Sequence, residues 1–211
     1  KQTKRHKTLR KNNIIKKFLI KKNQEQDIQR FLDMLISFNT HTNLVGKSTL
    51  KDPWKNHILD SLQILPHITN KNLSLIDMGT GAGFPGAVLS IMGCNNVTLV
   101  DSRRKKINFL SLAKTEMFLK YSTILGRVEE IKNLKYDIIT SRALANLETL
   151  FTYSQNFLKK KTVIIFLKGK TVNDEIKKAE IGWNFDYKKI QSLSDPRGSV
   201  LLIRNLRKIH D

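Results

Sequence analysis

The sequence contains little cysteine and few metal-ligating patterns, and these shortages exclude whole classes of protein. Cys94 is the only cysteine among 211 residues, which excludes a disulfide framework and any multi-cysteine metal site. It follows an apolar helical pattern, so we expect a buried, unreactive thiol. The five histidines lack the spacing of metal ligands, and we expect no metal.

Long apolar runs are also absent. The longest uninterrupted one covers residues 163–167, whereas a membrane span needs roughly 20 apolar residues. Near the start of the sequence, Lys16 and Lys17 interrupt the apolar residues, which excludes a secretory signal. We therefore expect a cytoplasmic protein with no membrane partner.

Acidic residues are outnumbered, 18 against 38 basic ones, for a formal net charge of +20. Ten basic residues and no acidic one fall within residues 1–22. A field of this sign attracts polyanions, nucleic acid first and anionic membrane second. The alternative is a lysine-rich proteome that raises the charge of every protein. We expect residues 1–24 to form a solvated basic arm or helix.

Residues 25–70 are predicted to form a helical extension. Residues 26–39 carry apolar side chains at helical spacing. Asp52 and Pro53 are typical of a helix start, and the helix that they open is predicted to run to about residue 66.

From residue 71 to 211 the pattern changes to an α/β domain with a Rossmann-like, mostly parallel sheet. Strands and helices alternate, which is typical of parallel strands with helical crossovers. The predicted strands are 73–78, 97–101, 122–125, 136–140 and 162–168, and the predicted helices are 86–93, 103–119, 146–158 and 172–180. The strands 185–192 and 199–204 are joined by a short turn, which predicts an antiparallel hairpin at the C-terminal end.

A glycine-rich loop, residues 77–86, follows the first strand and precedes a helix. Ligands of open α/β sheets bind at such strand ends, and Asp101 ends the next strand, where it can accept hydrogen bonds from ribose hydroxyls. Asp77 would repel a pyrophosphate but attract the ammonium group of an amino acid. Pro85 removes an N–H that would bind phosphate. With Gly79 and Gly81, this pattern favours S-adenosylmethionine over a dinucleotide.

The sequence resembles the bacterial 16S rRNA guanine-N7 methyltransferase G family, also called glucose-inhibited division protein B. The resemblance covers roughly residues 28–206, and the long lysine-rich start departs from it. It rests on seven strings in order: NLVG (43–46), HILDSL (57–62), DMGTGAGFPG (77–86), LVDSRRKKINFL (99–110), GRVEEI (126–131), YDIITSRALANL (136–147) and LKG (167–169).

The resemblance implies a class I methyltransferase fold, S-adenosylmethionine as methyl donor with S-adenosylhomocysteine as product, and N7 of a guanine in 16S rRNA of the small ribosomal subunit as acceptor. It places Gly79, Phe84, Val128 with Glu129, and Arg142 at the cofactor site. Guanine N7 carries a free lone pair and no proton, so we nominate no general base. His57 and Asp60, one helical turn apart, are expected to make structural hydrogen bonds rather than a catalytic pair.

Four basic residues are candidates for RNA contacts. Lys168 and Arg197 are expected at the same sheet edge, and Arg103 and Arg104 open the helix after the second strand. Lys168 and Arg197 could equally be solvated charges. For Arg103 and Arg104 a solvated helix start is the default, although positive charges oppose the helix dipole there and favour an anionic ligand. Two other functions stay open at this point: a methyltransferase of the same fold acting on another RNA or a protein, and a non-catalytic RNA-binding assembly factor. A nicotinamide-dependent dehydrogenase ranks last, and a monomer is expected.

Overall fold

The computed structural model describes residues 2–209, with side chains described from residue 6 onward. Its centre is a seven-stranded sheet in the order β3-β2-β1-β4-β5-β7-β6. The strands are β1 (Ser74–Met78), β2 (Asn96–Asp101), β3 (Ser122–Leu125), β4 (Tyr136–Arg142), β5 (Leu158–Lys168), β6 (Trp183–Gln191) and β7 (Ser199–Lys208). β1 to β5 pair in parallel, and β7 runs antiparallel to both β5 and β6. This confirms the predicted sheet and its terminal hairpin.

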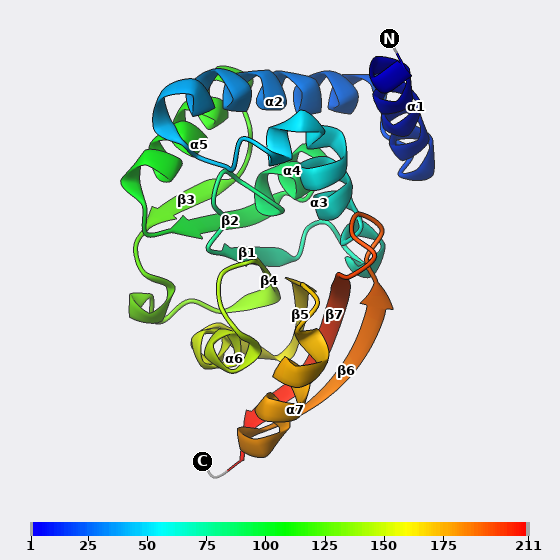
Figure 1. Ribbon diagram of the computed structural model, residues 1–211. Coiled ribbons are helices and arrows are strands. Elements are labelled where there is room, and N and C mark those ends of the chain that lie inside the picture. Colours follow the sequence, from blue (N-terminus) through cyan, green and yellow to red (C-terminus); the bar gives the residue numbers. More distant parts are fainter. Residues whose placement is uncertain (1, 210–211) are drawn as a thin grey trace.

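Helices cover both faces of the sheet (Figure 1). The longer ones are α1 (Gln2–Lys17), α2 (Lys22–Thr42), α4 (Gly86–Ile91), α5 (Arg104–Met117), α6 (Leu147–Gln155) and α7 (Val172–Gly182). Successive strand residues point to opposite faces, so Leu75 joins a core with α2, α4 and α5, whereas Ile76 joins a second core with α6 and α7. The sheet therefore separates two hydrophobic cores, and the ends of its strands remain available for a binding site.

The strand order reverses at β1, which lies between β2 and β4. Asp77 on β1 is level with Leu99 on β2 and Thr140 on β4. Crossover connections leave from opposite faces at such a point, and a crevice opens beyond the carboxyl ends of the strands. The glycine-rich loop after β1 lies at this position.

The prediction of one continuous helix from Asp52 to about residue 66 is wrong. The segment divides into a π-helix, η2 (Trp54–Leu59), one turn of α-helix, α3 (Asp60–Leu62), and a 3₁₀ turn, η3 (Leu65–His67). A π-helix contains an extra residue per turn and is frequent at functional sites. The extra residue changes which side chains face the sheet, which apolar spacing alone does not reveal. Two further 3₁₀ turns are η1 (Thr49–Lys51) and η4 (Val128–Glu130).

The basic N-terminal segment forms a helix, one of the two forms expected, and most of its described side chains are exposed. One side of it is docked, which was not expected. α1 packs on the rest of the chain through Ile14, and Ile20 follows it into the same core; these side chains are 4% and 7% exposed. Lys11 pairs with Glu25 at 2.8 Å and lies 4.9 Å from the centre of the Trp54 ring. The proposed division at residues 24 and 70 stays a prediction, because one core cluster runs through α1, α2, η2 and the sheet.

Candidate functional site

Two cavities open at the carboxyl ends of the parallel strands. The smaller, about 300 Å³, lies beyond β1, β2 and β3, and the larger, about 720 Å³, lies between η2, the end of β5 and the β6–β7 turn. Ala143, which follows β4, lines both of them. The two cavities are therefore adjacent compartments of one site.

The carboxylate of Asp77 holds the glycine-rich loop from beneath. Its Oδ2 accepts hydrogen bonds from the Thr80 hydroxyl at 2.6 Å and from the Gly86 N–H at 2.9 Å, and its Oδ1 accepts one from the Thr140 hydroxyl at 2.9 Å. Burial raises the pKa of Asp77 to about 6, although these three hydrogen bonds act to lower it. The side chain is fully buried. In this structure it therefore positions the loop, and its expected contact with the cofactor stays a prediction.

Gly79 forms the floor of the smaller cavity. Its φ of +64° lies in the left-handed region that favours glycine. A Cβ at this position would lie 2.6 Å from Leu144 Cδ1. The residue before Leu144, Ala143, also has a positive φ, +53°, so an unusual backbone turn after β4 brings the Leu144 side chain over Gly79.

Asp101 stands at the wall of the smaller cavity, as predicted from its place at the end of β2. Its Oδ2 accepts the Gly81 N–H at 3.0 Å, and its Oδ1 accepts the Arg103 N–H at 2.9 Å. Lys106 Nζ lies 3.6 Å from Oδ2. A carboxylate has about four acceptor positions, so Asp101 keeps capacity for two further donors, such as vicinal hydroxyls.

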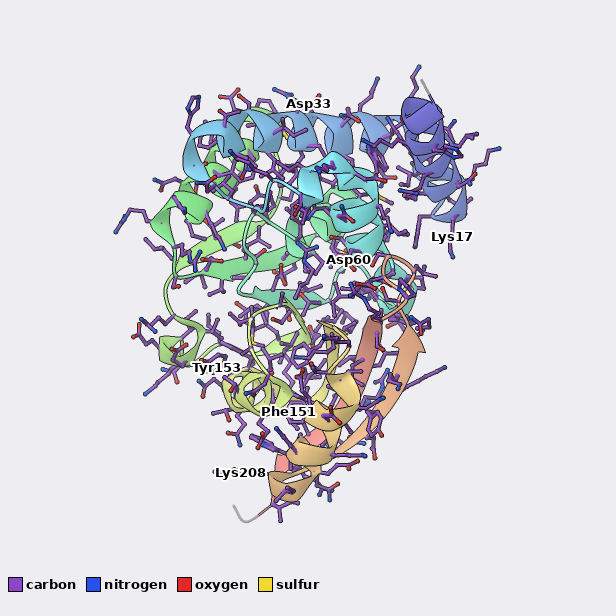
Figure 2. All side chains as sticks on the ribbon, viewed as in Figure 1. Lys17, Asp33, Asp60, Phe151, Tyr153 and Lys208 are labelled. Atoms are coloured by element: carbon purple, nitrogen blue, oxygen red, sulfur yellow. The ribbon has the colours of Figure 1, made fainter. Side chains whose placement is uncertain are left out.

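Val128 and Glu129 line the far end of the same cavity. Val128 is buried and supplies an apolar wall, whereas the Glu129 carboxylate is exposed and lies 3.6 Å from Arg127 Nη1. The short turn η4 that follows β3 places both residues beside Gly126. Tyr153 reaches this cavity from α6 and is labelled in Figure 2.

Arg142 lies in the larger cavity rather than the smaller one. Its Nη1 donates to Asp60 Oδ2 at 2.9 Å and to the Asn56 carbonyl at 3.1 Å, and its Nη2 lies 3.3 Å from His57 Nδ1. The side chain thereby joins the end of β4 to η2 and α3. The structure thus shows the structural hydrogen bonds expected of His57 and Asp60, with Arg142 as the common partner.

His57 is held as a neutral imidazole. Burial and the nearby Arg142 charge lower its pKa to about 3. Because arginine only donates, Nδ1 accepts from Arg142, and Nε2 carries the proton toward the Thr49 hydroxyl 2.9 Å away. The ring stacks on Phe84, with the ring centres 4.5 Å apart.

Phe84 is 1% exposed and lies under both His57 and the guanidinium of Arg142. It lines neither cavity. In this structure its ring supports the residues that line the larger cavity. A contact of Phe84 with the cofactor stays a prediction.

The four basic candidates for RNA contacts divide into two groups. Lys168 lines the larger cavity, but its Nζ pairs with Glu175 at 2.6 Å and donates to the Ala145 carbonyl, so its expected contact with RNA phosphate stays a prediction. Arg197 is 73% exposed at the rim of the larger cavity, where it pairs with Asp195. Arg103 and Arg104 are exposed at the start of α5, and Arg103 lines the smaller cavity.

Sequence reasoning missed several residues that complete the site. Leu144, Gly126 and Tyr153 line the smaller cavity, and Lys55 and Asn56 line the larger one. The first two follow predicted strands, a signal that was available from strand ends alone. Lys55 and Asn56 lie on the π-helix, which no local pattern of residues indicated.

The described residues contain neither a cluster of metal ligands nor a membrane-spanning helix. In the part of the chain that the structure describes, no group of three or more His, Cys, Asp or Glu side chains is arranged to hold a metal ion. None of the helices between residues 2 and 209 combines the length and the apolar character needed to cross a bilayer.

Comparisons with known proteins agree with this geometry. A family model described as rRNA small subunit methyltransferase G matches residues 24–202. The ribosomal RNA small subunit methyltransferase G of Rickettsia prowazekii is 39% identical over 184 residues, which cover 87% of this chain and 95% of the relative.

Two solved structures share the fold at low sequence identity. The ribosomal protein L11 methylase of Lactobacillus delbrueckii has a TM-score of 0.58 at 20% identity, covering 72% of this chain and 77% of that one. M. jannaschii TYW2 in complex with AdoMet has a TM-score of 0.53 at 17% identity, covering 70% of this chain and 74% of that one. These matches establish the class I methyltransferase fold.

Proposed function

Because the chain belongs to the rRNA small subunit methyltransferase G family, we propose that it transfers a methyl group from S-adenosylmethionine to N7 of one guanine in 16S rRNA. S-Adenosylhomocysteine is the second product. The observation that supports this best is the pair of adjoining cavities at the switch point of the sheet. One is sized for a nucleoside-containing cofactor, and the other is open to a larger substrate.

The smaller cavity fits the cofactor by the chemistry of its lining. Asp101 has unused acceptor capacity for the two ribose hydroxyls, and Val128 offers an apolar surface for the adenine ring. Glu129 and the backbone around it can form hydrogen bonds with the polar edge of that ring. Gly79 and Gly81 leave room for the methionine end of the cofactor above the loop, with Asp77 keeping the loop in place.

The bound cofactor supplies an activated methyl group on a sulfonium. The protein's task is to hold guanine N7 in line with that methyl group at about 3–3.5 Å. Because N7 carries no proton, no side chain has to remove one before the transfer. His57 agrees with this, since its lowered pKa and its two hydrogen-bonded nitrogens suit a structural imidazole and not a proton carrier.

The larger cavity is the proposed entry for the RNA. Lys55 and Arg197 lie at its lining and can contact phosphates, while Arg142 defines the boundary toward the cofactor. We therefore assign Arg142 to the RNA side of the site rather than to the cofactor. Arg103 and Arg104 lie at the opposite rim, where they can meet RNA that extends past the smaller cavity.

The remaining parts of the proposal follow from the substrate. The partner is 16S rRNA or the small ribosomal subunit, and the protein acts in the cytoplasm, where this RNA is assembled into ribosomes. We propose that the protein acts as a monomer.

The test is methyl transfer from labelled S-adenosylmethionine to small subunits and rRNA that lack the modification. Label recovered as 7-methylguanosine at one position supports the proposal. Cofactor binding without label in rRNA would redirect the activity to transfer RNA or protein, which are the acceptors of the alternative function. The absence of cofactor binding would overturn the enzymatic function.

A further inference from the structure

The N-terminal helix α1 contains seven Lys or Arg residues and no acidic residue among its 16 residues. Like charges three and four residues apart on a helix repel each other. Lys7, for example, is three residues before Arg10 and four before Lys11. Such a helix is unfavourable alone and requires docking to a surface or a polyanion.

One side of α1 is docked on the rest of the chain. Arg10 forms an ion pair with Asp52, Lys11 pairs with Glu25 and covers the Trp54 ring, and Ile14 enters the core. These contacts fix the helix against η2. Lys7, Lys16 and Lys17 remain exposed, as do Lys21 and Lys22 after the helix.

η2 connects this basic helix with the larger cavity. Asp52, which holds Arg10, also accepts the Lys55 N–H at 3.3 Å. Lys55, Asn56 and His57 of η2 line the larger cavity on their other side. Figure 2 shows Lys17 and Asp60 on the same side of the molecule, far from Lys208. The basic surface of α1 therefore continues the rim at which we place the RNA.

We infer that α1 is a second RNA-binding element that holds the phosphate backbone of the substrate outside the larger cavity. The inference rests on the proposed function and extends it to a segment that lies before the matched family region, residues 24–202. Fixed cationic side chains that bind phosphates release condensed counterions, which provides affinity without reading sequence.

A lipid surface fits the helix less well. Interfacial helices insert a free apolar face into the membrane. The apolar side chains on the docked side of α1 are occupied, because Ile14 is buried and Ile15 packs against the same core, as does Phe18 just after the helix. Apart from Leu9, which is 53% exposed, the exposed side chains of the described part of α1 are polar or charged.

The test uses the full chain with Lys7→Gln, Lys16→Gln and Lys17→Gln combined. Arg10 and Lys11 are kept because they dock the helix. The matched control removes the same charge at the far end of the molecule, with Lys177→Gln, Lys178→Gln and Lys208→Gln, all exposed. The measurements are the Kd for an unmodified 16S rRNA transcript against salt concentration, the KM for small subunits, and the Kd for S-adenosylhomocysteine.

We expect the α1 variant to bind the transcript about 10-fold more weakly at low salt, with the slope of log K against log salt reduced by about 2. The control changes neither value appreciably, and both variants keep the wild-type affinity for S-adenosylhomocysteine. An α1 variant that matches the control in Kd, slope and KM would overturn the inference while leaving the proposed function intact. A wild-type chain that methylates no rRNA would instead overturn the proposed function.

Vesicles containing phosphatidylserine provide the remaining comparison. Binding to them that the α1 variant loses, together with an unchanged affinity for rRNA, would identify α1 as a lipid contact and would also overturn the inference.

Discussion

The guanidinium of Arg142 and the carboxylate of Asp60 meet at 2.9 Å, although 82 residues separate them in the sequence. Asp60 also accepts hydrogen bonds from Ser194 in the β6–β7 turn and from Gln63, both on Oδ1. One carboxylate thus joins the end of β4, the helical extension and the terminal hairpin. Together with the end of β5, these parts of the chain surround the larger cavity.

Asp60→Asn is expected to loosen that cavity. The substitution removes the charge facing Arg142, and the loss of a charged hydrogen bond at a partly buried site lowers the free energy of unfolding by about 1–3 kcal/mol. The KM for small subunits rises, whereas the Kd for S-adenosylmethionine stays near its wild-type value. Chemical unfolding and steady-state kinetics measure the two effects.

The matched control is Asp137→Asn, near the start of β4 and so at the opposite end of the strand from Arg142. Asp137 pairs with Lys159 at 2.8 Å, and this pair with the Ser74 hydrogen bonds holds its carboxyl pKa below the usual range. The control is expected to lose stability without a change in KM. Equal changes in KM for both variants would mean that Asp60 acts only through global stability.

Asp77 gives a pH-dependent prediction. Its carboxyl has a pKa of about 6 in the folded chain against 3.8 as the ordinary value, so the folded state binds the proton more tightly. Its contribution to stability is fully present below about pH 3.8 and is lost as the pH rises through 6. Asp77→Asn does not titrate. The variant should therefore gain about 2 kcal/mol relative to wild type between pH 4 and 7.5, measured by urea unfolding. A difference independent of pH would contradict the burial of a charged carboxylate.

Gly79→Ala tests the close approach of Leu144. The left-handed φ costs an alanine about 1–2 kcal/mol, and its Cβ would displace Leu144 into the smaller cavity. The affinity for S-adenosylhomocysteine should fall. Adding Leu144→Ala should restore part of that affinity but none of the backbone cost. Gly182→Ala, where a Cβ meets open space, is the control. Full recovery of stability in the double variant would contradict the backbone explanation.

Cys94 is expected to be inert in the folded protein. The side chain is 2% exposed, and burial raises the pKa of its thiol to about 11. Thiolate is the reactive form, so modification by an aromatic disulfide reagent at pH 8 should be slower by about 100-fold or more than in the unfolded chain. Rapid labelling under native conditions would show that the helix α4 end opens readily.

Strand positions, the sheet class and the place of the glycine-rich loop could be predicted because they depend on local signals. Apolar runs of strand length, glycines at alternate positions and Asp101 at a strand end are all readable along the chain. Val128 and Glu129 lie where the resemblance and the third strand place them, and their role toward a ligand stays a prediction.

The partners of charged and polar side chains could not be predicted, because they depend on contacts between distant segments. The pairing of Lys168 with Glu175 and the enclosure of Asp77 by Thr80 and Thr140 arise only when the elements pack. Phe84 illustrates the same limit: its neighbours His57 and Arg142 come from other parts of the chain, so its packing against them could not be predicted from the sequence.

The most direct test of the account is a comparison of two variants that separates the two cavities. Asp101→Asn changes the smaller one, and Lys55→Gln with Arg197→Gln changes the larger one. The account predicts that the first variant raises the Kd for S-adenosylmethionine about 10-fold, the value of a charged hydrogen bond, and leaves the KM for small subunits unchanged. It predicts that the second raises that KM several-fold and leaves the cofactor Kd unchanged. Parallel effects of both variants on both ligands would contradict the division of the site into a cofactor cavity and an RNA cavity.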